Sequence, residues 1–345
     1  MNTKTRRIIL SILCAIILLG AAAVATAYYL FYSPTFHPKA TVYIYVDRDD
    51  TADSVYHKID VAAGHPRMVG LKLLAKQRQY ERRVRTGRYA IRPKESAYQL
   101  MSHLLSGHQE PINLTIGSDR MLERMAGRVG RKLMVDSAEI MCYLTDTAVV
   151  RQLGYTAETL PALFLPDTYQ VYWDVSVEKL IARMQKEYSR FWNAEREAKA
   201  KELGMSKVEV ATLASIVEEE TNNRQEKPVV AGLYINRLKR GMPLQADPTV
   251  KFALQDFALR RITFDHLRTD SPYNTYIYPG LPPGPIRIPS KEGLDAVLNY
   301  TRHNYLYMCA KEDFSGTHNF ASSLAQHNVN ARRYQQALNS RKIYR

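Results

Sequence analysis

Three consecutive glutamates at positions 218–220 are the residues of this chain best suited to acid chemistry. They end an apolar stretch that reads "ASIVEEETN" over residues 214–222. A carboxyl group serves as a general acid near neutral pH where burial and neighbouring carboxylates raise its pKa. The ordinary alternative is a solvated helix end, because glutamates are seldom buried.

A helical wheel at about 100° per residue separates the three carboxylates. It predicts Glu219 in solvent, opposite the apolar stripe, and Glu218 at a margin of small alanines. Glu220 lies at the other margin, where Leu213 and Ile216 are large enough to exclude water. Glu220 is therefore the candidate acid with a raised pKa, and Glu218 is the reserve. The stripe consists of Val210, Leu213, Ala214 and Val217.

The N-terminal segment decides in which compartment this chemistry takes place. Residues 8–32 carry no charge and, as a helix, exceed the roughly 20 residues that cross a bilayer. Lys4, Arg6 and Arg7 precede them and predict that residues 1–7 are a cytoplasmic tail and that the rest lies outside the cytoplasmic membrane. We expect a single-pass anchor. The alternative is a signal peptide cleaved at the small residues 25–27.

The exported remainder divides into two predicted units. After a linker at 33–40, residues 41–116 form a small α+β module, with strands expected at 41–46, 86–91 and 111–116. Helices are expected around 54–63, around 66–80, and between an N-cap at Ser96 and a stop at Gly107. Residues 117–345 predict a larger, mainly helical domain with irregular segments at 164–173 and 278–289. The predicted fold class is α+β.

Charge and cysteine content restrict the partners. A net charge of +14 suits an anionic polymer or a membrane surface. Nucleic acid is not expected outside the membrane, and the chain lacks an Arg-rich run. Neither CxxC nor HExxH occurs, so no zinc site is indicated. Cys142 and Cys309 lie outside the anchor, and whether they pair is left open by the sequence.

Several motifs in a fixed order give the chain a family resemblance. They are "LFLPDTY" (163–169), "IVEEET" (216–221), "VAGLYINRLKRGMPLQADPTVKFAL" (230–254), "SPYNTYIYPGLPPGPIRIP" (271–289) and "HNFASSLAQHN" (318–328). Together they resemble the endolytic murein transglycosylase, or YceG-like, family over nearly the whole chain. The resemblance implies a LysM-like module at 41–116, a catalytic domain at 117–345 and no cofactor.

The resemblance also implies the reaction. In that family a glutamate directly before threonine is catalytic, and the matching pair here is Glu220 and Thr221. The substrate would be nascent peptidoglycan glycan strands, cut between N-acetylmuramic acid and N-acetylglucosamine with formation of a 1,6-anhydro end. Peptidoglycan synthases are the candidate protein partners. One departure is Glu219, which stands where the family commonly has lysine.

Five further residues are the candidates for substrate binding. Asp247 has an equal alternative as a turn residue before Pro248, and Asp167 is expected to be a turn or cap residue. The rigid "GLPPGPI" segment is expected to form a wall of the glycan groove. The histidines and asparagines of the last motif, His318, Asn319, His327 and Asn328, are expected to be structural and not metal ligands. The five candidates are Gln245, Asp247, Asn274, Thr275 and Tyr276.

Two other functions remain open at this point. One is a membrane-tethered peptidoglycan-binding scaffold without activity, and the presence of Glu220 speaks against it. The other is a muramidase that hydrolyses the same bond. A hydrolase usually needs two carboxylates, and the motifs show no second one.

Overall fold

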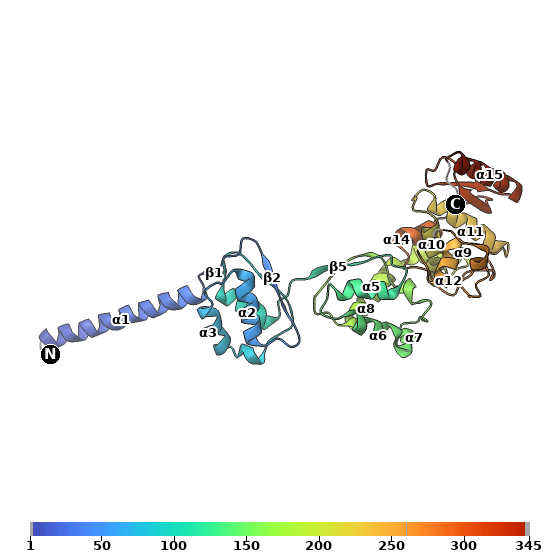
Figure 1. Cartoon of the computed structure of the whole chain (residues 1–345). Coiled ribbons are helices and arrows are strands. Elements are labelled where there is room, and N and C mark those ends of the chain that lie inside the picture. The colour runs from blue at the N-terminus through green and yellow to red at the C-terminus, as the bar shows by residue number, and fades with distance from the viewer. Residues whose placement is uncertain (1–2, 260, 342–345) are drawn as a thin grey trace. The chain divides into compact units, whose positions relative to one another are not determined.

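The chain folds into two compact units. Figure 1 shows the computed structural model, which describes residues 3–259 and 261–341. One unit comprises Met1–Asn113 with Gln170–Val175, and the other comprises Leu114–Tyr169 with Ser176–Arg345. Helices predominate, and the strands form two-stranded sheets, so the described residues have the predicted α+β class.

A long apolar helix, α1 (Thr3–Phe31), opens the first unit. None of its residues is buried by the rest of the protein. It is long and apolar enough to cross a membrane, and it is the one such helix in the described part of the chain. Its position agrees with the segment expected to be an anchor.

The rest of the first unit is built on two small antiparallel sheets. β2 pairs with β3 from Val42 opposite Ile91 to Val46 opposite Gly87, and β1 pairs with β4. The predicted strands and helices of this region are confirmed, with ends that shift by one to three residues. The elements are β1 (Pro34–Phe36), β2 (Val42–Val46), α2 (Ala52–Ala63), α3 (Val69–Gln77), η1 (Tyr80–Arg82), β3 (Gly87–Ile91), β4 (Glu95–Ser96) and α4 (Ala97–Ser106).

Local sequence signals fix the ends of these helices. Thr51 and Ser96 are N-caps of α2 and α4, each with a reciprocal capping box. Gly64 and Gly107 end the same helices with φ of 75° and 72°, a conformation that glycine adopts without strain. The prediction of a linker at residues 33–40 is partly wrong, because these residues include β1 and because Phe36 is buried in the core of the first unit.

The second unit carries most of the helices. β5 (Ile112–Ile116) pairs with β6 (Asp167–Val171). Helix α5 buries Met125, Ala126 and Val129. The first helices of the unit are α5 (Leu122–Gly130), α6 (Ser137–Thr145), α7 (Thr147–Gln152), η2 (Leu160–Leu163), α8 (Val177–Phe191) and α9 (Ala194–Leu203).

Helix α10 (Lys207–Glu220) is the centre of the second unit. All of its residues from Val210 to Glu218 are buried, because α11 and α14 pack against it. A helix that is apolar on all sides belongs inside a domain, so the predicted single apolar stripe is too narrow. The remaining elements are α11 (Lys227–Lys239), α12 (Asp247–Leu254), α13 (Phe264–Leu267), α14 (Lys291–Leu298), β7 (Tyr307–Ala310), β8 (His318–Ala321) and α15 (Leu324–Ser340).

Candidate active site

The three glutamates at the end of α10 meet three different surroundings. The helix begins at Ser206, whose hydroxyl oxygen accepts a hydrogen bond from the backbone N–H of Glu209. It ends at Thr221, where the backbone becomes extended. Because the helix is enclosed, successive side chains in its last turn contact different neighbours instead of sharing one solvated face.

Glu218 is a buried structural carboxylate. It accepts hydrogen bonds from the backbone N–H and the hydroxyl of Ser290, the N-cap of α14, and Lys227 Nζ lies 3.7 Å away. A Cβ at position 293 would come within 2.7 Å of the Glu218 Cδ, so Gly293 is what leaves room for the carboxylate. The reserve candidate therefore ties α10 to α14.

The solvent position predicted for Glu219 is wrong. Its carboxylate accepts two hydrogen bonds from Arg120, at 2.8 and 2.7 Å, and one from Arg287 at 3.1 Å. The side chain is only 10% exposed. Neither arginine is near Glu219 in the sequence, so the helical wheel could not anticipate that two guanidinium groups would cover this position.

Glu220 lines a polar cavity of about 270 Å³. Its Oε1 accepts a hydrogen bond from the phenol of Tyr234 on α11 at 2.8 Å. The strand pair β7 and β8 contributes one side of the cavity, and the segment before α12 contributes another. The lining residues are Glu220, Leu233, Tyr234, Arg237, Leu244, Gln245, Asp247, Tyr276, Met308, Cys309, Ala310 and His318.

The surroundings of Glu220 raise its pKa to about 7. Burial is the main cause, because it disfavours the charged form, and the negative charges of Asp247 and Glu219 act in the same direction. The hydrogen bond from Tyr234 and the charge of Lys251 oppose the rise. A carboxyl group with this pKa can donate a proton and later accept one near neutral pH.

Arg237 organises the wall around Gln245. Its buried guanidinium donates to the carbonyl oxygens of Leu306 at 2.6 Å and Leu244 at 2.9 Å, and to Gln245 Oε1 at 3.2 Å. Gln245 has a φ of 51°, a left-handed conformation that is uncommon outside glycine. Gln245 therefore reaches the cavity on a backbone that Arg237 holds in place.

Asp247 and Tyr276 form a second polar pair in the cavity. The Tyr276 hydroxyl donates to Asp247 Oδ1 at 2.6 Å. Asp247 is the first residue of α12 and is exposed. The structure thus brings Gln245, Asp247 and Tyr276 into one cavity with Glu220, and Asp247, which the sequence suggested only for substrate binding or a turn, is a second carboxylate beside the candidate acid.

Asn274 and Thr275 are not among the residues that line this cavity. Asn274 is fully buried, and its amide donates to the carbonyl oxygens of Leu267 and Thr269, both at 2.9 Å. Thr275 is also buried and accepts a hydrogen bond from the backbone N–H of Ala246 at 3.1 Å. In the structure these two side chains hold the loop that carries Tyr276.

The "GLPPGPI" segment is likewise absent from the described lining of the cavity. It packs on α10, where Ile286 N–H donates to the buried Ser215 hydroxyl at 3.0 Å. A Cβ at position 284 would lie 2.0 Å from the Glu158 carbonyl oxygen, so this close approach requires Gly284. The segment therefore supports α10.

Other candidates of the sequence have structural contacts. Asp167 forms an ion pair with Lys291 and accepts a hydrogen bond from the backbone N–H of Thr168. His318 lies on the cavity, and its Nδ1 is 3.1 Å from Glu226 Oε2. Asn319 donates to Glu312 at 2.6 Å, and the His327 ring stacks on Tyr307. Cys142 and Cys309 are free thiols.

Sequence reasoning missed Tyr234 and Arg237, which contact the candidate site directly. Both lie in the "GLYINRL" part of a motif that carries the resemblance, three residues apart and thus on one side of α11. A buried tyrosine and a buried arginine on one helix face signal polar partners, because such groups are rarely buried without them. The sequence did not indicate which partners these are.

Comparisons with known proteins identify the family of this chain. The sequence profile of the YceG-like family matches residues 44–333. The chain belongs to the YceG-like family. It is 29% identical to the endolytic murein transglycosylase of Bacillus subtilis strain 168 over 258 residues, which is 70% of this chain and 69% of that protein.

Two more relatives are similar over different lengths. The endolytic murein transglycosylase of Streptococcus pneumoniae is 28% identical over 66% of this chain, and the match spans only 46% of that longer protein. The crystal structure of a putative YceG-like protein from Listeria monocytogenes superposes with a TM-score of 0.55 at 25% identity. It covers 84% of this chain and 99% of its own, so the YceG-like fold extends over most of the protein.

Proposed function

We propose that this YceG-like protein is an endolytic murein transglycosylase that cuts peptidoglycan glycan strands and leaves 1,6-anhydro ends. The observation that carries the proposal is Glu220, a carboxyl group with a pKa of about 7 in a polar cavity that a sugar chain can reach. The names of the relatives from B. subtilis and S. pneumoniae support the choice of murein as substrate.

The proposed reaction uses one carboxyl group twice. Protonated Glu220 donates its proton to the glycosidic oxygen while the bond from C1 of N-acetylmuramic acid to that oxygen breaks. The 2-acetamido group of the sugar supports the positive charge at C1. The Glu220 carboxylate then takes the proton of the C6 hydroxyl as O6 bonds to C1, which closes the anhydro ring and restores the acid. No water is consumed.

The other cavity residues have roles in binding and positioning. Gln245 and the pair formed by Asp247 and Tyr276 offer donors and acceptors to sugar hydroxyl and amide groups. Tyr234 orients the Glu220 carboxyl group through its hydrogen bond. The described residues contain no group of three histidine, cysteine, aspartate or glutamate side chains that could hold a metal ion.

We also propose the location of the reaction. α1 serves as a single-pass anchor in the cytoplasmic membrane, with the N-terminus inside and both units outside. The enzyme then acts on nascent strands near the membrane, ends their elongation and works beside peptidoglycan synthases. The module at residues 41–116 is proposed to be LysM-like and to bind glycan.

A hydrolytic muramidase is the second candidate. The observation that favours it is Asp247, a second carboxylate in the same cavity, because hydrolysis of a glycosidic bond usually uses two carboxylates. The two candidates differ by one water in their products.

Mass spectrometry of the products decides between them. The full-length chain in detergent is incubated with purified glycan strands beside the Glu220→Gln variant. Anhydro-ended fragments from the parent and at least a hundredfold fewer from the variant are expected. Reducing ends would assign a hydrolase, and bound but intact strands would favour a scaffold without activity.

A further inference from the structure

The end of α1 is packed directly on the first unit. A Cβ at position 70 would lie 1.9 Å from the carbonyl oxygen of Leu30, so Gly70 is what allows α3 to approach the last turn of α1. The rings of Tyr32 and Tyr98 lie 5.0 Å apart, which joins α1 to α4. These contacts make the end of the proposed anchor and the surface around it one body.

The chain leaves α1 without a free linker. β1 starts at Pro34, and Phe36 is fully buried in the core of the first unit. The backbone carbonyl of Phe36 accepts a hydrogen bond from Lys94 N–H at 2.8 Å. The first unit is therefore held at the depth where the apolar helix ends.

Large apolar side chains are exposed on α3 and α4, the two helices that contact the end of α1. Val69 and Leu73 lie one turn apart on α3 and are 52% and 48% exposed, while Leu71 and Leu74 on the other side of α3 are buried. Tyr98 on α4 is exposed too. Water does not favour such a patch, and its continuity with α1 identifies the bilayer as what covers it.

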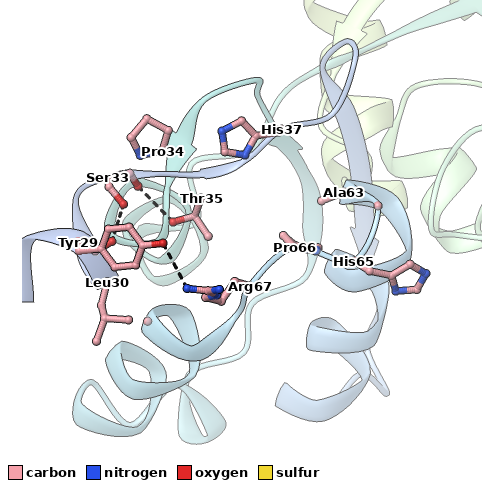
Figure 2. A pocket seen from close by; sticks show the side chains of 12 residues that line it. Tyr29, Leu30, Ser33, Pro34, Thr35, His37, Ala63, His65, Pro66 and Arg67 are labelled. Atoms are coloured by element: carbon pink, nitrogen blue, oxygen red, sulfur yellow. Dashed lines mark hydrogen bonds between the residues drawn. The ribbon is translucent and has the colours of Figure 1, made fainter. Parts of the chain in front are cut away.

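A polar pocket of about 380 Å³ lies beside this patch and is shown in Figure 2. Arg67 points toward Tyr29, and its Nη1 donates to the Tyr29 hydroxyl at 3.2 Å. Within residues 3–259 and 261–341, no carboxylate forms an ion pair with Arg67. By contrast, His65 is paired with Asp60 at 2.7 Å. Ser33 and Thr35 line the same pocket, where their hydroxyl groups donate to the backbone carbonyl oxygens of Tyr29 and Ser33.

We propose that the face of the first unit formed by Val69, Leu73 and Tyr98 rests in the headgroup layer of the membrane, with a phospholipid phosphate bound at Arg67. A guanidinium group binds phosphate through two parallel hydrogen bonds, and the Tyr29 hydroxyl, which accepts a hydrogen bond from Arg67, keeps its own proton as a further donor. Tyrosine rings favour this depth of a bilayer. The inference rests on the proposed anchor and adds a defined orientation of the first unit on the lipid surface.

Tryptophan probes in the full-length chain test the orientation. The protein is reconstituted into vesicles of phosphatidylglycerol and phosphatidylethanolamine brominated on the acyl chains near the headgroup, and the emission of the parent's own tryptophans is subtracted. Leu73→Trp is expected to be quenched at least twice as strongly as Tyr43→Trp. Tyr43 is 39% exposed on β2, which lies on the side of the first unit away from α1 (Figure 1).

A probe within α1 separates the two proposals. Ile16→Trp reports whether α1 is in the bilayer at all, because Ile16 lies in its apolar centre. Strong quenching of Ile16→Trp together with equally weak quenching of Leu73→Trp and Tyr43→Trp would overturn the orientation and leave the anchor intact. Weak quenching of all three would overturn the anchor and the orientation together.

The phosphate is tested by substitution of Arg67. Arg67→Ala is expected to reduce the quenching of Leu73→Trp about twofold, and Arg67→Lys to retain most of it. In vesicles of an uncharged glycosyl diacylglycerol, which has no phosphate, the alanine substitution should have no effect. An equal effect in both lipids would overturn the phosphate site. Loss of the Arg67-dependent quenching upon addition of inorganic phosphate would instead assign the pocket to the free anion.

Discussion

The phenol of Tyr234 donates a hydrogen bond of 2.8 Å to Oε1 of Glu220, between helices α11 and α10. The pKa of each group is raised, which favours the neutral form of both. Burial and the nearby Glu220 raise the pKa of Tyr234, and burial raises that of Glu220 to about 7. The tyrosine therefore stays a donor, and the glutamate can change its protonation state beside it near neutral pH.

Removal of that donor should move the activity profile to higher pH. The hydrogen bond from Tyr234 lowers the pKa of Glu220, because it stabilises the carboxylate. In Tyr234→Phe the general acid stays protonated to higher pH. The alkaline limb of the kcat/KM profile, near pH 7 in the parent, should therefore move to higher pH by up to about one pH unit. This shift corresponds to the loss of a hydrogen bond of about 1 kcal/mol. Tyr188→Phe is the control, a half-buried tyrosine of α8 that does not line the cavity, and should leave the limb in place. A limb that does not move in Tyr234→Phe would contradict the role given to Tyr234.

Substitution of Asp247 should move the same limb in the opposite direction. Its negative charge raises the pKa of Glu220. In Asp247→Asn the acid should lose its proton at lower pH, so kcat/KM should begin to fall below pH 7. Measurement of the full pH–rate profile checks this, with Asp167→Asn as a control for a surface carboxylate that pairs with Lys291.

The hydrolase alternative gives a different result for Asp247→Asn. If Asp247 activated water, the substitution would abolish the activity at every pH and would not displace the profile. Preserved activity with a shifted profile would count against a catalytic base at this position.

Glu220 should also make the stability of the protein depend on pH. Its pKa rises from 4.5 to about 7 on folding, so the folded state holds the proton more tightly than the unfolded state does. The stability from this group is complete below about pH 4.5 and is lost as pH rises to about 7, by about 3 kcal/mol. Relative to the parent, Glu220→Gln should gain that amount over this range.

Urea unfolding of parent and variant at pH 4.5 and 8 measures this difference, since the contributions of other groups cancel. A constant difference between the two proteins would mean that Glu220 titrates normally. A difference that grows with pH would instead place activity and stability in conflict at one residue, because the burial that raises the pKa of Glu220 makes its ionised form costly.

The local signals in the sequence predicted the first unit well. Ser96 and Gly107 mark the ends of α4 through a capping box and a left-handed glycine, and these effects need no distant partner. Prediction was less successful where contacts between distant parts of the chain determine the position of a side chain. The wheel placed Glu219 in solvent, since it contained no information on Arg120 and Arg287, which approach from distant parts of the chain.

The same difference between local sequence signals and long-range contacts applies to the candidate site. Glu220 could be selected from its neighbours because size and hydrophobicity along one helix estimate desolvation. Asn274 and Thr275 were predicted beside Tyr276 in the groove, but only Tyr276 lines the cavity, because the turn of the loop directs the other two side chains inward. The sequence pattern alone cannot distinguish a residue whose side chain stabilises a loop from one whose side chain the loop directs into the cavity.

Glu218 ties α10 to α14, whereas Glu220 is the proposed acid, and this difference leads to the last prediction. Glu218→Gln keeps the size of the side chain but removes the charge that Lys227 and the Ser290 donors bind, so it should destabilise the fold by about 1–3 kcal/mol. Gly293→Ala should cost a similar amount, since the new methyl group would press on the Glu218 carboxylate. Both variants, assayed well below their melting temperatures, should keep kcat within a few fold of the parent, whereas Glu220→Gln should lose activity while it remains folded. Thermal unfolding and product release measured on the same samples separate the two effects. A folded Glu218→Gln variant without activity would transfer the catalytic role to the glutamate that ties α10 to α14.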